Sequence, residues 1–530
     1  MPYSPIRNQD GFRLLFLDIQ NHYVLARGRN VCRIQFYNNN ENEISVGAKP
    51  YSTVIIGANG IGKSFILSAI AEIFRRLKKV QSEGTVFKKD RLNFQFTIQY
   101  FFCGHKYKIS SFNENKKGLN NLDEYYSCWE DDKNVGLHRC PLPTAVLASS
   151  ITISDRFRIP KDPDGYYWYL GARNENSPGT TGTRTIVRKT VAAIAECLTH
   201  DNYFKESLLS LLEKLGFEPK LEIEYAIRYK NVYLKHLESE EDFASVFNNW
   251  ESVFELSGSK RKTAPWGHKK FSAVSKKPEN ISLIVGYLRR IVENNRINRQ
   301  GHLIYSIHEN SFKDEWSAIQ LLSQLDILSY PRIRVYKKAS KSENYNSFLF
   351  EDSSTGETSL LCQFINLLSR IQQHSLILID EPETSSHPNW QIHYIDWLND
   401  IFSRFYTCHF VLSTHSHFLL SELEEGNSAI VALSKNDKTG EIENMTAELN
   451  TFGWSTDDIL YEVFNIRNRR NEALARDLEH AMQLIDNGRP VSEEEKQVLL
   501  QRFKNVYQGE RDPLGRLIKE FEEYAESRSK

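Results

Sequence analysis

The chain has 530 residues, of which 40% are hydrophobic and 12% aromatic, and its formal net charge is −1. This length and composition predict a globular protein with two or three domains. The near-neutral charge excludes attraction of nucleic acid by a global positive field, so any such contact must come from a local patch. No signal core and no run of about 18 apolar residues is present, so we expect no membrane partner and exclude transport by this chain alone.

The cysteine pattern predicts a reducing compartment. Seven cysteines are scattered along the chain without a C-x-x-C pair: Cys32, Cys103, Cys128, Cys140, Cys197, Cys362 and Cys408. An odd number of isolated cysteines is typical of free thiols. We therefore expect a cytoplasmic protein and no structural zinc site.

A glycine-rich loop stands near the N-terminus. Residues 12–17 and 31–36 predict two strands, and residues 54–56 predict a third, which leads directly into the sequence GANGIGKS at 57–64 and then into a helical pattern. A strand, such a loop and a helix in this order predict a cradle of backbone N–H groups around a polyphosphate. The plain glycine-rich turn is the less favoured alternative. We expect the following ATP-binding residues: Gly57, Asn59, Gly60, Gly62, Lys63 on the β- and γ-phosphates, and Ser64, which is also a Mg²⁺ ligand.

The segment after the first helix predicts more of the same sheet. Residues 94–102 and 106–109, separated by Gly104, predict a β-hairpin, and residues 144–148 predict a buried strand. Residues 156–189 are rich in Pro, Gly, Asn and Thr, with an aromatic group at 166–169, and predict an ordered loop. Its arginines, Arg173, Arg184 and Arg188, either approach phosphates or, as we favour, are solvated.

Residues 190–335 alternate helical patterns, such as 207–212 and 283–292, with polar loops and predict a helical insertion. Within it, residues 260–277 carry seven Lys or Arg and no acid, interleaved with Trp266, His268 and Phe271. Such a basic loop suits a nucleic-acid backbone. A solvated lysine loop is at least as good an interpretation.

Three further segments complete the nucleotide site. Ser354, Gly356 and Glu357 precede a helix whose apolar residues at 360–371 keep helical spacing, and small residues at a helix N-terminus can bind an anion. Residues 376–379 predict a buried strand that ends in Asp380 and Glu381.

The two acids that end this strand have separable predicted roles. We expect Asp380 to hold the Mg²⁺ shell and Glu381 to take a proton from the attacking water. Residues 410–413 predict another buried strand, which ends near His415. This histidine either donates to the γ-phosphate or is an ordinary strand-end histidine.

In this order the segments resemble the ABC-type ATPases, with a Walker A loop at 57–64, a signature at 354–357, a Walker B strand ending in Asp380 and Glu381, and a switch histidine at His415. The resemblance covers about residues 10–150 and 335–435. It implies a head-to-tail homodimer or higher oligomer, in which Ser354, Gly356 and Glu357 of one subunit complete the ATP site of the other.

Residues 380–391, DEPETSSHPNWQ, are similar to the E-P-E-x-x-L-H-P pattern of the RecF, OLD and prokaryotic defence branch. Ser386 replaces the usual leucine and Thr355 replaces the usual glycine or serine of the signature, which puts the rate of hydrolysis in question. Residues 149–155 occupy the place of the Q-loop and contain no glutamine.

The C-terminal part lacks the D-x-D of the nuclease domain that OLD-type proteins carry. Residues 452–471 are instead similar to the tail of the PtuA family, the ATPases of the Septu anti-phage system and of some retrons. That resemblance implies an HNH nuclease partner of the PtuB kind and, in retrons, a reverse transcriptase with its RNA–DNA hybrid. Asp457 and Asp458 fit the start of a helix better than a metal site.

The sequence therefore predicts an α/β ABC-ATPase head, a mixed sheet with an antiparallel β-subdomain and helices on both faces. We expect an N-terminal lobe at 1–150, a loop and helical insertion at 151–335, a C-terminal lobe at 336–435 and a helical region at 436–530. The predicted function is a slow ATPase that restrains a partner nuclease. The alternatives are a RecF-like clamp on DNA and an OLD-like nuclease ATPase.

Overall fold

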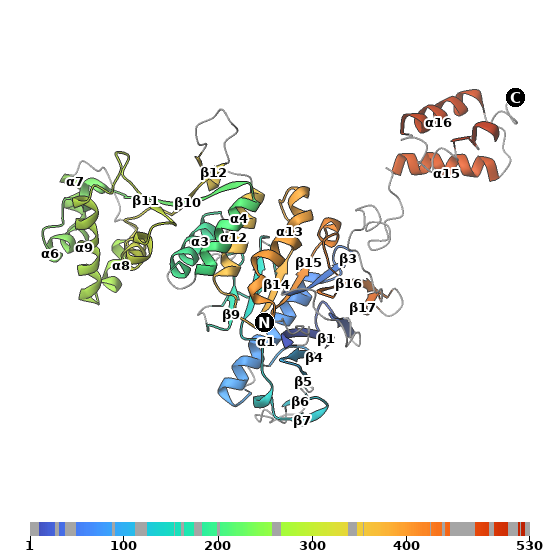
Figure 1. Ribbon diagram of the computed structural model, residues 1–530, viewed down its shortest axis with the longest axis horizontal. Helices are drawn as coiled ribbons and strands as arrows, with labels where there is room; N and C mark the ends of the chain where they lie inside the picture. Colours follow the sequence, from blue (N-terminus) through green and yellow to red (C-terminus); the bar gives the residue numbers. More distant parts are fainter. Residues whose placement is uncertain are drawn as a thin grey trace, which may run out of the picture. The chain divides into compact units, whose positions relative to one another are not determined.

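The computed structural model describes residues 10–26, 31–37, 49–86, 91–111, 125–152, 154–160, 164–173, 183–198, 202–256, 267–337, 347–352, 355–424, 426–436, 440–445, 472–486, 492–506, 518–519 and 521–524. The chain forms two compact units, Met1–Thr456 and Asp457–Lys530 (Figure 1).

In the described part of the first unit, thirteen strands form one sheet, in the order β7-β6-β5-β4-β1-β2-β17-β16-β3-β15-β14-β8-β9. The strands are β1 (Phe12–Gln20), β2 (Val31–Gln35), β3 (Tyr51–Gly57), β4 (Gln95–Phe102), β5 (His105–Ser111), β6 (Tyr126–Glu130), β7 (Lys133–Val135), β8 (Val146–Ser150), β9 (Tyr167–Tyr169), β14 (Leu376–Asp380), β15 (His409–Ser413), β16 (Ser428–Lys435) and β17 (Ile442–Met445).

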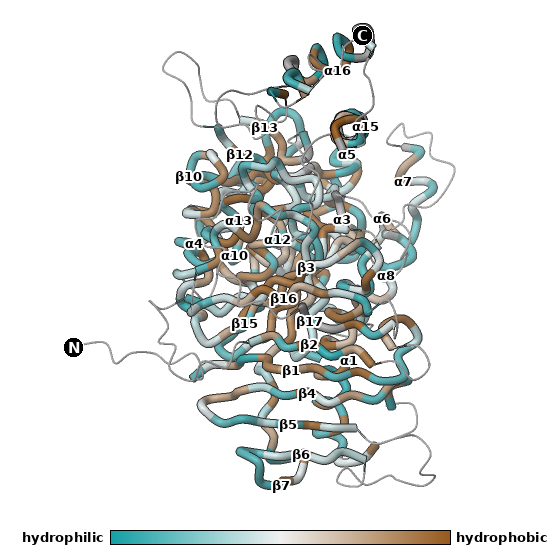
Figure 2. The backbone as a smooth tube through the Cα atoms, turned by 90° about the vertical axis from the view of Figure 1, so that its right-hand side faces the viewer, coloured by the Kyte–Doolittle hydropathy of each residue, from teal (hydrophilic) through white to brown (hydrophobic). Residues whose placement is uncertain are grey.

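The sheet changes character along its width. From β16 through β3, β15, β14 and β8 to β9 all neighbours are parallel, whereas β2, β1 and β4–β7 pair antiparallel. All five residues of β14 and of β15 are buried, as expected for parallel strands covered on both faces. Figure 2 shows the hydrophobic central strands and the more polar β6 and β7 at the end of the sheet.

Helices cover the parallel strands. α1 (Lys63–Glu83) packs against β3, β15, β14 and β8, and α12 (Thr355–Leu368) packs against β8 and α3 (Thr183–Cys197). α13 (Pro388–Ile401) contacts α4 (Asn202–Lys214). The remaining short elements here are η3 (Leu137–Arg139), η4 (Phe350–Asp352), η5 (Ser403–Phe405) and η6 (His417–Leu420).

The insertion contains a second sheet that the sequence analysis does not predict. Four antiparallel strands lie in the order β11-β10-β12-β13: β10 (Phe217–Ala226), β11 (His302–Ser306), β12 (Arg332–Lys337) and β13 (Ser347–Leu349). The helices predicted at 207–212 and 283–292 are present as parts of α4 and of α9 (Pro278–Glu293). The other helices here are α5 (Lys230–Tyr233), α6 (Glu240–Asn248), α7 (Trp250–Leu256), α8 (His268–Val274), α10 (Ser311–Asp314) and α11 (Trp316–Gln324). The insertion is therefore mixed rather than only helical.

The second unit contains α15 (Glu472–Asp486) and α16 (Glu493–Val506), which share a small core with Ile518, Phe521 and Tyr524. Both helices lie within residues 436–530, predicted to be helical, but residues 442–445 of that range form the strand β17. The PtuA-like segment 452–471 lies outside the described residues, and so do Asp457 and Asp458. Across the described parts of the chain, no helix combines the length and apolar composition needed to cross a bilayer.

The predicted fold class is confirmed, because a mixed sheet with an antiparallel β-subdomain carries helices against its parallel strands. The strands predicted at 12–17, 31–36, 144–148 and 376–379 and the hairpin at 94–109 are present. The prediction of a loop at 166–169 is wrong, because residues 167–169 form β9 and pair in parallel with β8. Tyr166, Tyr167 and Tyr169 are buried there, and this burial favours a strand.

Candidate functional site

Three neighbouring parallel strands bring the predicted residues to one edge of the sheet. β15 lies between β3 and β14, and Ser413 stands opposite both Ile55 and Asp380. The carboxyl ends of parallel strands share one edge, so the loops that follow β3, β14 and β15 meet there. This is the expected place of a ligand in such a sheet.

The loop at 57–64 has the backbone that only glycine adopts easily. Gly60 has φ +79° and Gly62 has φ +108°, both in the left-handed region that disfavours other residues. A Cβ on Gly62 would also lie 2.6 Å from Cδ2 of Leu25, which packs beside the loop. α1 begins at the next residue, so its free N–H groups and positive end face the loop.

Lys63 lies at the centre of this edge. Its Nζ donates to the carbonyl of Gly57 over 2.8 Å and lies 3.3 Å from Nδ1 of His415. Burial lowers the pKa of Lys63 to about 8, and Glu381 and Glu383 oppose this shift. Because the Lys63 ammonium is poorly solvated, a bound anion such as a phosphate would stabilise its charge.

Ser64 and Asp380 form an oxygen pair. The Ser64 hydroxyl donates to Oδ1 of Asp380 over 3.0 Å, and the hydroxyl of Ser413 donates to the same oxygen. Burial raises the pKa of Asp380, and these two hydrogen bonds oppose the shift. A hydroxyl and a carboxylate suit Mg²⁺, which takes one or two protein oxygens and fills its remaining positions with water and phosphate. The residues present therefore fit the ion.

Glu381 is positioned beside this pair but remains accessible. Its φ is +50°, and its N–H donates to the carbonyl of Ser413 over 3.0 Å, which turns the chain at the end of β14. The carboxylate is 31% exposed and its Oε1 lies 3.7 Å from Nε2 of His415. A carboxylate held between buried groups and solvent can meet a water molecule.

His415 faces both Lys63 and Glu381. Burial lowers its pKa, and Lys63 lowers it further, so the imidazole is neutral at pH 7. Because Nδ1 receives the Lys63 ammonium, the ring proton belongs on Nε2, which faces Glu381. The backbone N–H of His415 donates to Oε1 of Glu383 over 2.7 Å. Lys63, Ser64, Asp380, Glu381 and His415 are thus brought together.

The signature residues are placed only in part. Ser354 lies outside the described residues. Gly356 is buried in the first turn of α12, and a Cβ there would lie 2.3 Å from the carbonyl oxygen of Ser385. Glu357, half-buried, is the next residue of that turn. α12 therefore begins in close contact with the segment that follows Glu383.

The sequence analysis does not predict two aromatic residues beside the phosphate loop, His22 and Tyr23. Tyr23 is 69% exposed, stacks on His22 at 4.8 Å between ring centroids and meets the Phe65 ring edge-on at 5.9 Å. The turn that carries it is fixed by His22, whose Nδ1 accepts the N–H groups of Val24 and Leu25. An isolated tyrosine in a polar turn gives no signal in the sequence.

The end of β8 supplies the other missed residues. Ser150 stands opposite Asp380, in the place where the sequence lacks a glutamine, and its hydroxyl lies 3.0 Å from that of Thr152. The buried carboxylate of Asp155 follows and is held by Arg173 through Nε and a terminal nitrogen at 2.9 and 2.6 Å. The favoured interpretation of Arg173 as a solvated arginine is therefore wrong, because it pairs with a buried acid.

A family model described as "AAA domain, putative AbiEii toxin, Type IV TA system" matches residues 52–421, a span that includes the loop at 57–64, Asp380 and His415. No curated protein matches the chain.

Solved structures at 12% identity were also found. The Smc head domain with an extended coiled coil bound to the C-terminal domain of ScpA, derived from Pyrococcus furiosus, aligns over 86% of this chain and 100% of its own, with a TM-score of 0.31. The SMC head domain from Thermotoga maritima aligns over 82% of this chain and 100% of its own, with a TM-score of 0.34. The recombination mediator protein RecF in the RecFOR pathway aligns over 83% of this chain and 99% of its own, with a TM-score of 0.28.

Proposed function

Because the chain belongs to the family described as "AAA domain, putative AbiEii toxin, Type IV TA system", we propose that it binds ATP with Mg²⁺ at the edge formed by β3, β15 and β14 and hydrolyses it. The observation that carries this proposal is the hydrogen bond of 3.0 Å between Ser64 and Asp380. It joins the end of the phosphate loop to Asp380, the last residue of the buried strand β14, which lies 316 residues further along the chain.

The residues have separable roles in this proposal. Backbone N–H groups of the loop at 57–64, which contains Gly57, Asn59, Gly60 and Gly62, hold the phosphates, and Lys63 neutralises the β- and γ-phosphates. The positive φ of Gly60 and Gly62 permits the shape of the loop. Ser64 and Asp380 would hold Mg²⁺, which when bound offsets the charge of the phosphate oxygens.

Hydrolysis in the proposal depends on the pair Glu381 and His415. Glu381 accepts a proton from the attacking water, and the Nε2–H of His415 points toward the space beside that carboxylate. The test is steady-state ATP hydrolysis by the purified full chain with Mg²⁺. We expect turnover in the wild type and its loss in Glu381→Gln with ATP binding retained; turnover by that variant at the wild-type rate would refute the assignment.

We further propose that two copies associate head to tail through ATP. The support is the resemblance of residues 354–357 to a signature, of which the buried Gly356 and the half-buried Glu357 lie in the first turn of α12. Sedimentation of the Glu381→Gln variant with and without ATP tests this. A sedimentation coefficient that ATP does not change would contradict it.

For the biological role we propose a cytoplasmic subunit of an anti-phage system that restrains an HNH nuclease of the PtuB kind, with a reverse transcriptase and RNA–DNA hybrid as further partners if the system is a retron. The support is the resemblance of residues 380–391 and 452–471. All seven cysteines are free thiols, as a reducing compartment requires. Affinity purification from the native operon should recover a nuclease, and the chain alone should not cut DNA.

A second candidate is direct binding of DNA, as in a RecF-like clamp. The observation that favours it is the exposure of Lys269, Lys270, Lys276 and Lys277 in and after α8. Residues 260–266 of the predicted basic loop lie outside the described residues. Duplex binding that weakens steeply with salt and disappears when these lysines become glutamines would support this candidate over the first.

A further inference from the structure

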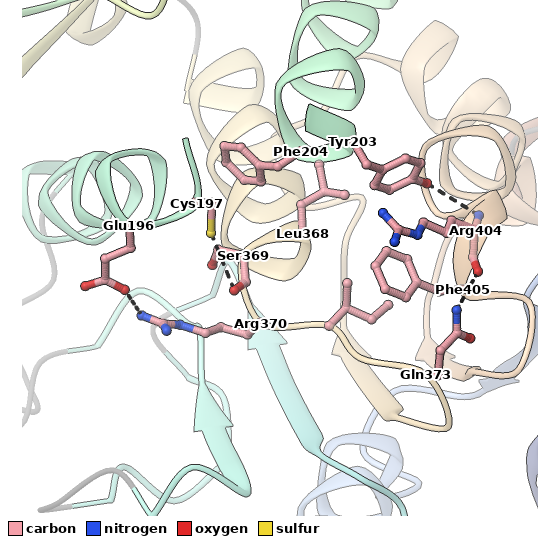
Figure 3. Close-up of a pocket in the computed structure, with 11 residues that line it drawn as sticks. Glu196, Cys197, Tyr203, Phe204, Leu368, Ser369, Arg370, Gln373, Arg404 and Phe405 are labelled. Carbon is pink, nitrogen blue, oxygen red and sulfur yellow. Dashed lines mark hydrogen bonds and ion pairs between the residues drawn. The ribbon is translucent and has the colours of Figure 1, made fainter. Parts of the chain in front are cut away.

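The first unit contains a pocket of about 420 Å³, lined by the end of α3, the start of α4, the turn between α12 and β14, and η5 (Figure 3). Polar side chains of this pocket bind the protein itself. Arg370 pairs with Glu196 at 2.6 Å, and the Gln373 side chain donates to the carbonyl of Arg404 over 2.8 Å. A cluster of unequal charge lies elsewhere in the unit, on the second sheet, where β10, β11 and β12 carry it.

One face of the second sheet packs into the core and the other face is polar. On β10 the acids Glu222 and Glu224 alternate with buried apolar residues and therefore point to the polar face. Arg334 and Arg332 of β12 stand opposite these two acids, and His302 belongs to β11, on the other side of β10. The apolar residues that alternate with the acids are Leu221, Ile223 and Tyr225.

Glu224 binds three basic side chains at the centre of this polar face. Its Oε1 lies 2.5 Å from a terminal nitrogen of Arg332 and 2.5 Å from Nδ1 of His302. Its Oε2 accepts a hydrogen bond from Arg334 over 2.7 Å. The Glu224 side chain is 1% exposed, and both of its oxygens are occupied. Glu224, His302, Arg332 and Arg334 form what we call the Glu224 cluster.

The Glu224 cluster carries one excess positive charge, because two guanidiniums share one carboxylate and the imidazole is counted as neutral. The neighbouring Glu222 does not cancel this charge. It pairs with Lys220 at 3.0 Å and accepts the hydroxyl of Tyr336 over 2.6 Å. Within the part of the chain that the structure describes, Glu224 is the only acid that forms an ion pair with Arg332 or Arg334.

The excess charge is accessible but only partly solvated. The side chains of Arg332 and Arg334 are 30% and 27% exposed. A guanidinium has five N–H donors. Among the described residues, Arg332 spends one on Glu224, and Arg334 spends two, on Glu224 and on the hydroxyl of Ser347. The two arginines are therefore held side by side with donors left for a further anion.

The surroundings of the cluster favour a single phosphate. The pair of Lys220 and Glu222 beside it is balanced, so the positive charge is confined to one place and does not form a track for a polyanion. Arginine forks match phosphate geometry, and a phosphate monoester has three terminal oxygens, enough for both forks. Ile304 stands opposite Glu224 on β11 and is 40% exposed. Cross-strand neighbours share a face, so apolar surface lies beside the arginines.

We propose that the Glu224 cluster binds a small phosphate monoester, with the phosphate on Arg332 and Arg334 and the organic group over Ile304. The site belongs to the sheet of the insertion, whereas the proposed ATP site lies at the edge formed by β3, β15 and β14 of the other sheet. Binding at the Glu224 cluster is therefore independent of the proposed ATPase activity.

The experiment uses the full chain and phenyl phosphate as the probe, with isothermal titration as the measurement. Two matched probes separate the contributions: benzoate replaces the phosphate by a carboxylate, and inorganic phosphate lacks the organic group. The variant Lys63→Met disables the phosphate loop and reveals any signal from the ATP site. We expect phenyl phosphate to bind the wild type and Lys63→Met equally, and both matched probes to bind more weakly.

Two substitutions change the charge of the cluster in opposite directions. Arg332→Gln removes the excess charge but leaves Glu224 paired with Arg334, and it should weaken phenyl phosphate by at least about tenfold. Glu224→Gln keeps an oxygen that can accept from the arginines but removes the negative charge. It should therefore strengthen binding by at least about threefold, which a purely structural role of the cluster would not produce.

Arg228→Gln is the matched control, because Arg228 lies in the same insertion and forms a one-to-one ion pair with Asp326 at 2.7 Å. It should bind phenyl phosphate like the wild type. Equal affinity in Arg332→Gln and the wild type, equal affinity for phenyl phosphate and benzoate, loss of binding in Lys63→Met, or no saturable binding would each overturn the proposal. Equal affinity for inorganic phosphate would overturn the placement of the organic group. If Glu224→Gln does not fold, the comparison of Arg332→Gln with Arg228→Gln decides.

Discussion

The Lys63 ammonium lies 3.3 Å from Nδ1 of His415, so the cation of the phosphate loop and the histidine at the end of β15 share one hydrogen bond. This contact requires a neutral imidazole, in agreement with the lowered pKa of His415. It also leaves the Lys63 charge among buried groups, where desolvation brings its pKa to about 8. The free protein is therefore close to losing the charge that the triphosphate needs.

ATP affinity should fall as the pH rises through about 8. The pKa of Lys63 in the free protein is about 8, and a bound triphosphate favours the ammonium. Above that pH, binding must first restore the proton, which costs up to about tenfold in affinity per pH unit. Titration of Mg-free ATP between pH 7 and 9.5 measures this. Lys63→Met should bind more weakly with a flat profile, and a flat wild-type profile would contradict the prediction.

Substitution of Glu381 should lower the ATPase rate more than substitution of Glu383. Glu381→Gln removes the proposed base and should lower the ATPase rate at least about 100-fold, the usual contribution of a general base. Glu383→Gln is the matched control, because its amide oxygen can still accept the N–H of His415. We expect a smaller loss there. Equal losses in the two variants would assign both acids to structure rather than to proton transfer.

Tyr23 should contribute to nucleotide affinity through its ring. It is exposed beside the loop and held edge-on by Phe65, so a base can stack on it. Stacking on an aromatic side chain contributes about 1–3 kcal/mol, so Tyr23→Ala should weaken ATP binding by about 5- to 150-fold. Tyr23→Phe retains the ring and should bind like the wild type. Triphosphate alone should bind both variants equally, and a loss for triphosphate would exclude stacking as the cause.

The strands of the nucleotide lobe are predictable because their signals are local. β14 is a run of apolar residues that is buried throughout, and the loop at 57–64 follows its strand directly. The sheet of the insertion is not predicted, although Leu221, Ile223 and Tyr225 of β10 alternate with acids and are buried on one face. That alternation is a local signal of a strand, but β11 and β12, the partners of β10, lie far along the chain, and no local pattern specifies their pairing.

The residues of the site also divide into those predictable from local motifs and those that depend on contacts between distant segments. Lys63 and Asp380 are predicted from motifs, but Tyr23 and the pair of Asp155 and Arg173 depend on contacts between segments without periodicity. When only its local sequence is considered, the charge of Arg173 suggests a side chain exposed to solvent. Its burial against Asp155 follows from the fold of β9 beside β8, which local composition does not specify.

Gly356 should not tolerate a side chain. A Cβ there would lie 2.3 Å from the backbone oxygen of Ser385, so Gly356→Ala must move α12 away from the segment after Glu383. Such overpacking costs about 1–3 kcal/mol of unfolding free energy, and we expect ATP turnover to fall as well. Gly286→Ala is the control, because that helical glycine has no neighbour within 4 Å and alanine there should stabilise α9 by about 0.5–1 kcal/mol. Denaturant unfolding that ranks the two variants equally would contradict the prediction.

The protein should lose stability in weak acid through His409. This buried ring accepts the N–H of Leu14 on Nδ1 over 2.9 Å, and its Nε2 lies 2.8 Å from the Thr53 hydroxyl, which donates to the Phe36 carbonyl. Because Nδ1 accepts an N–H it cannot carry a proton, so the ring is neutral with its proton on Nε2, which donates to the Thr53 hydroxyl. Burial keeps the pKa of His409 well below its usual value.

The sign of the pH dependence follows from this lowered pKa. As the pH falls below about 6.5, the unfolded chain takes up a proton on His409 and the folded chain does not, so the unfolding free energy falls by up to about 1.4 kcal/mol per pH unit. Urea unfolding between pH 7.5 and 5 should show this slope, and His409→Asn should reduce it. His105→Asn is the control, because that exposed histidine binds Asp131 and its pKa is raised, so its loss cannot reduce the slope. A slope that His409→Asn leaves unchanged would assign the acid sensitivity to other groups, of which His22, with a pKa lowered to about 4 by burial, is the next to test.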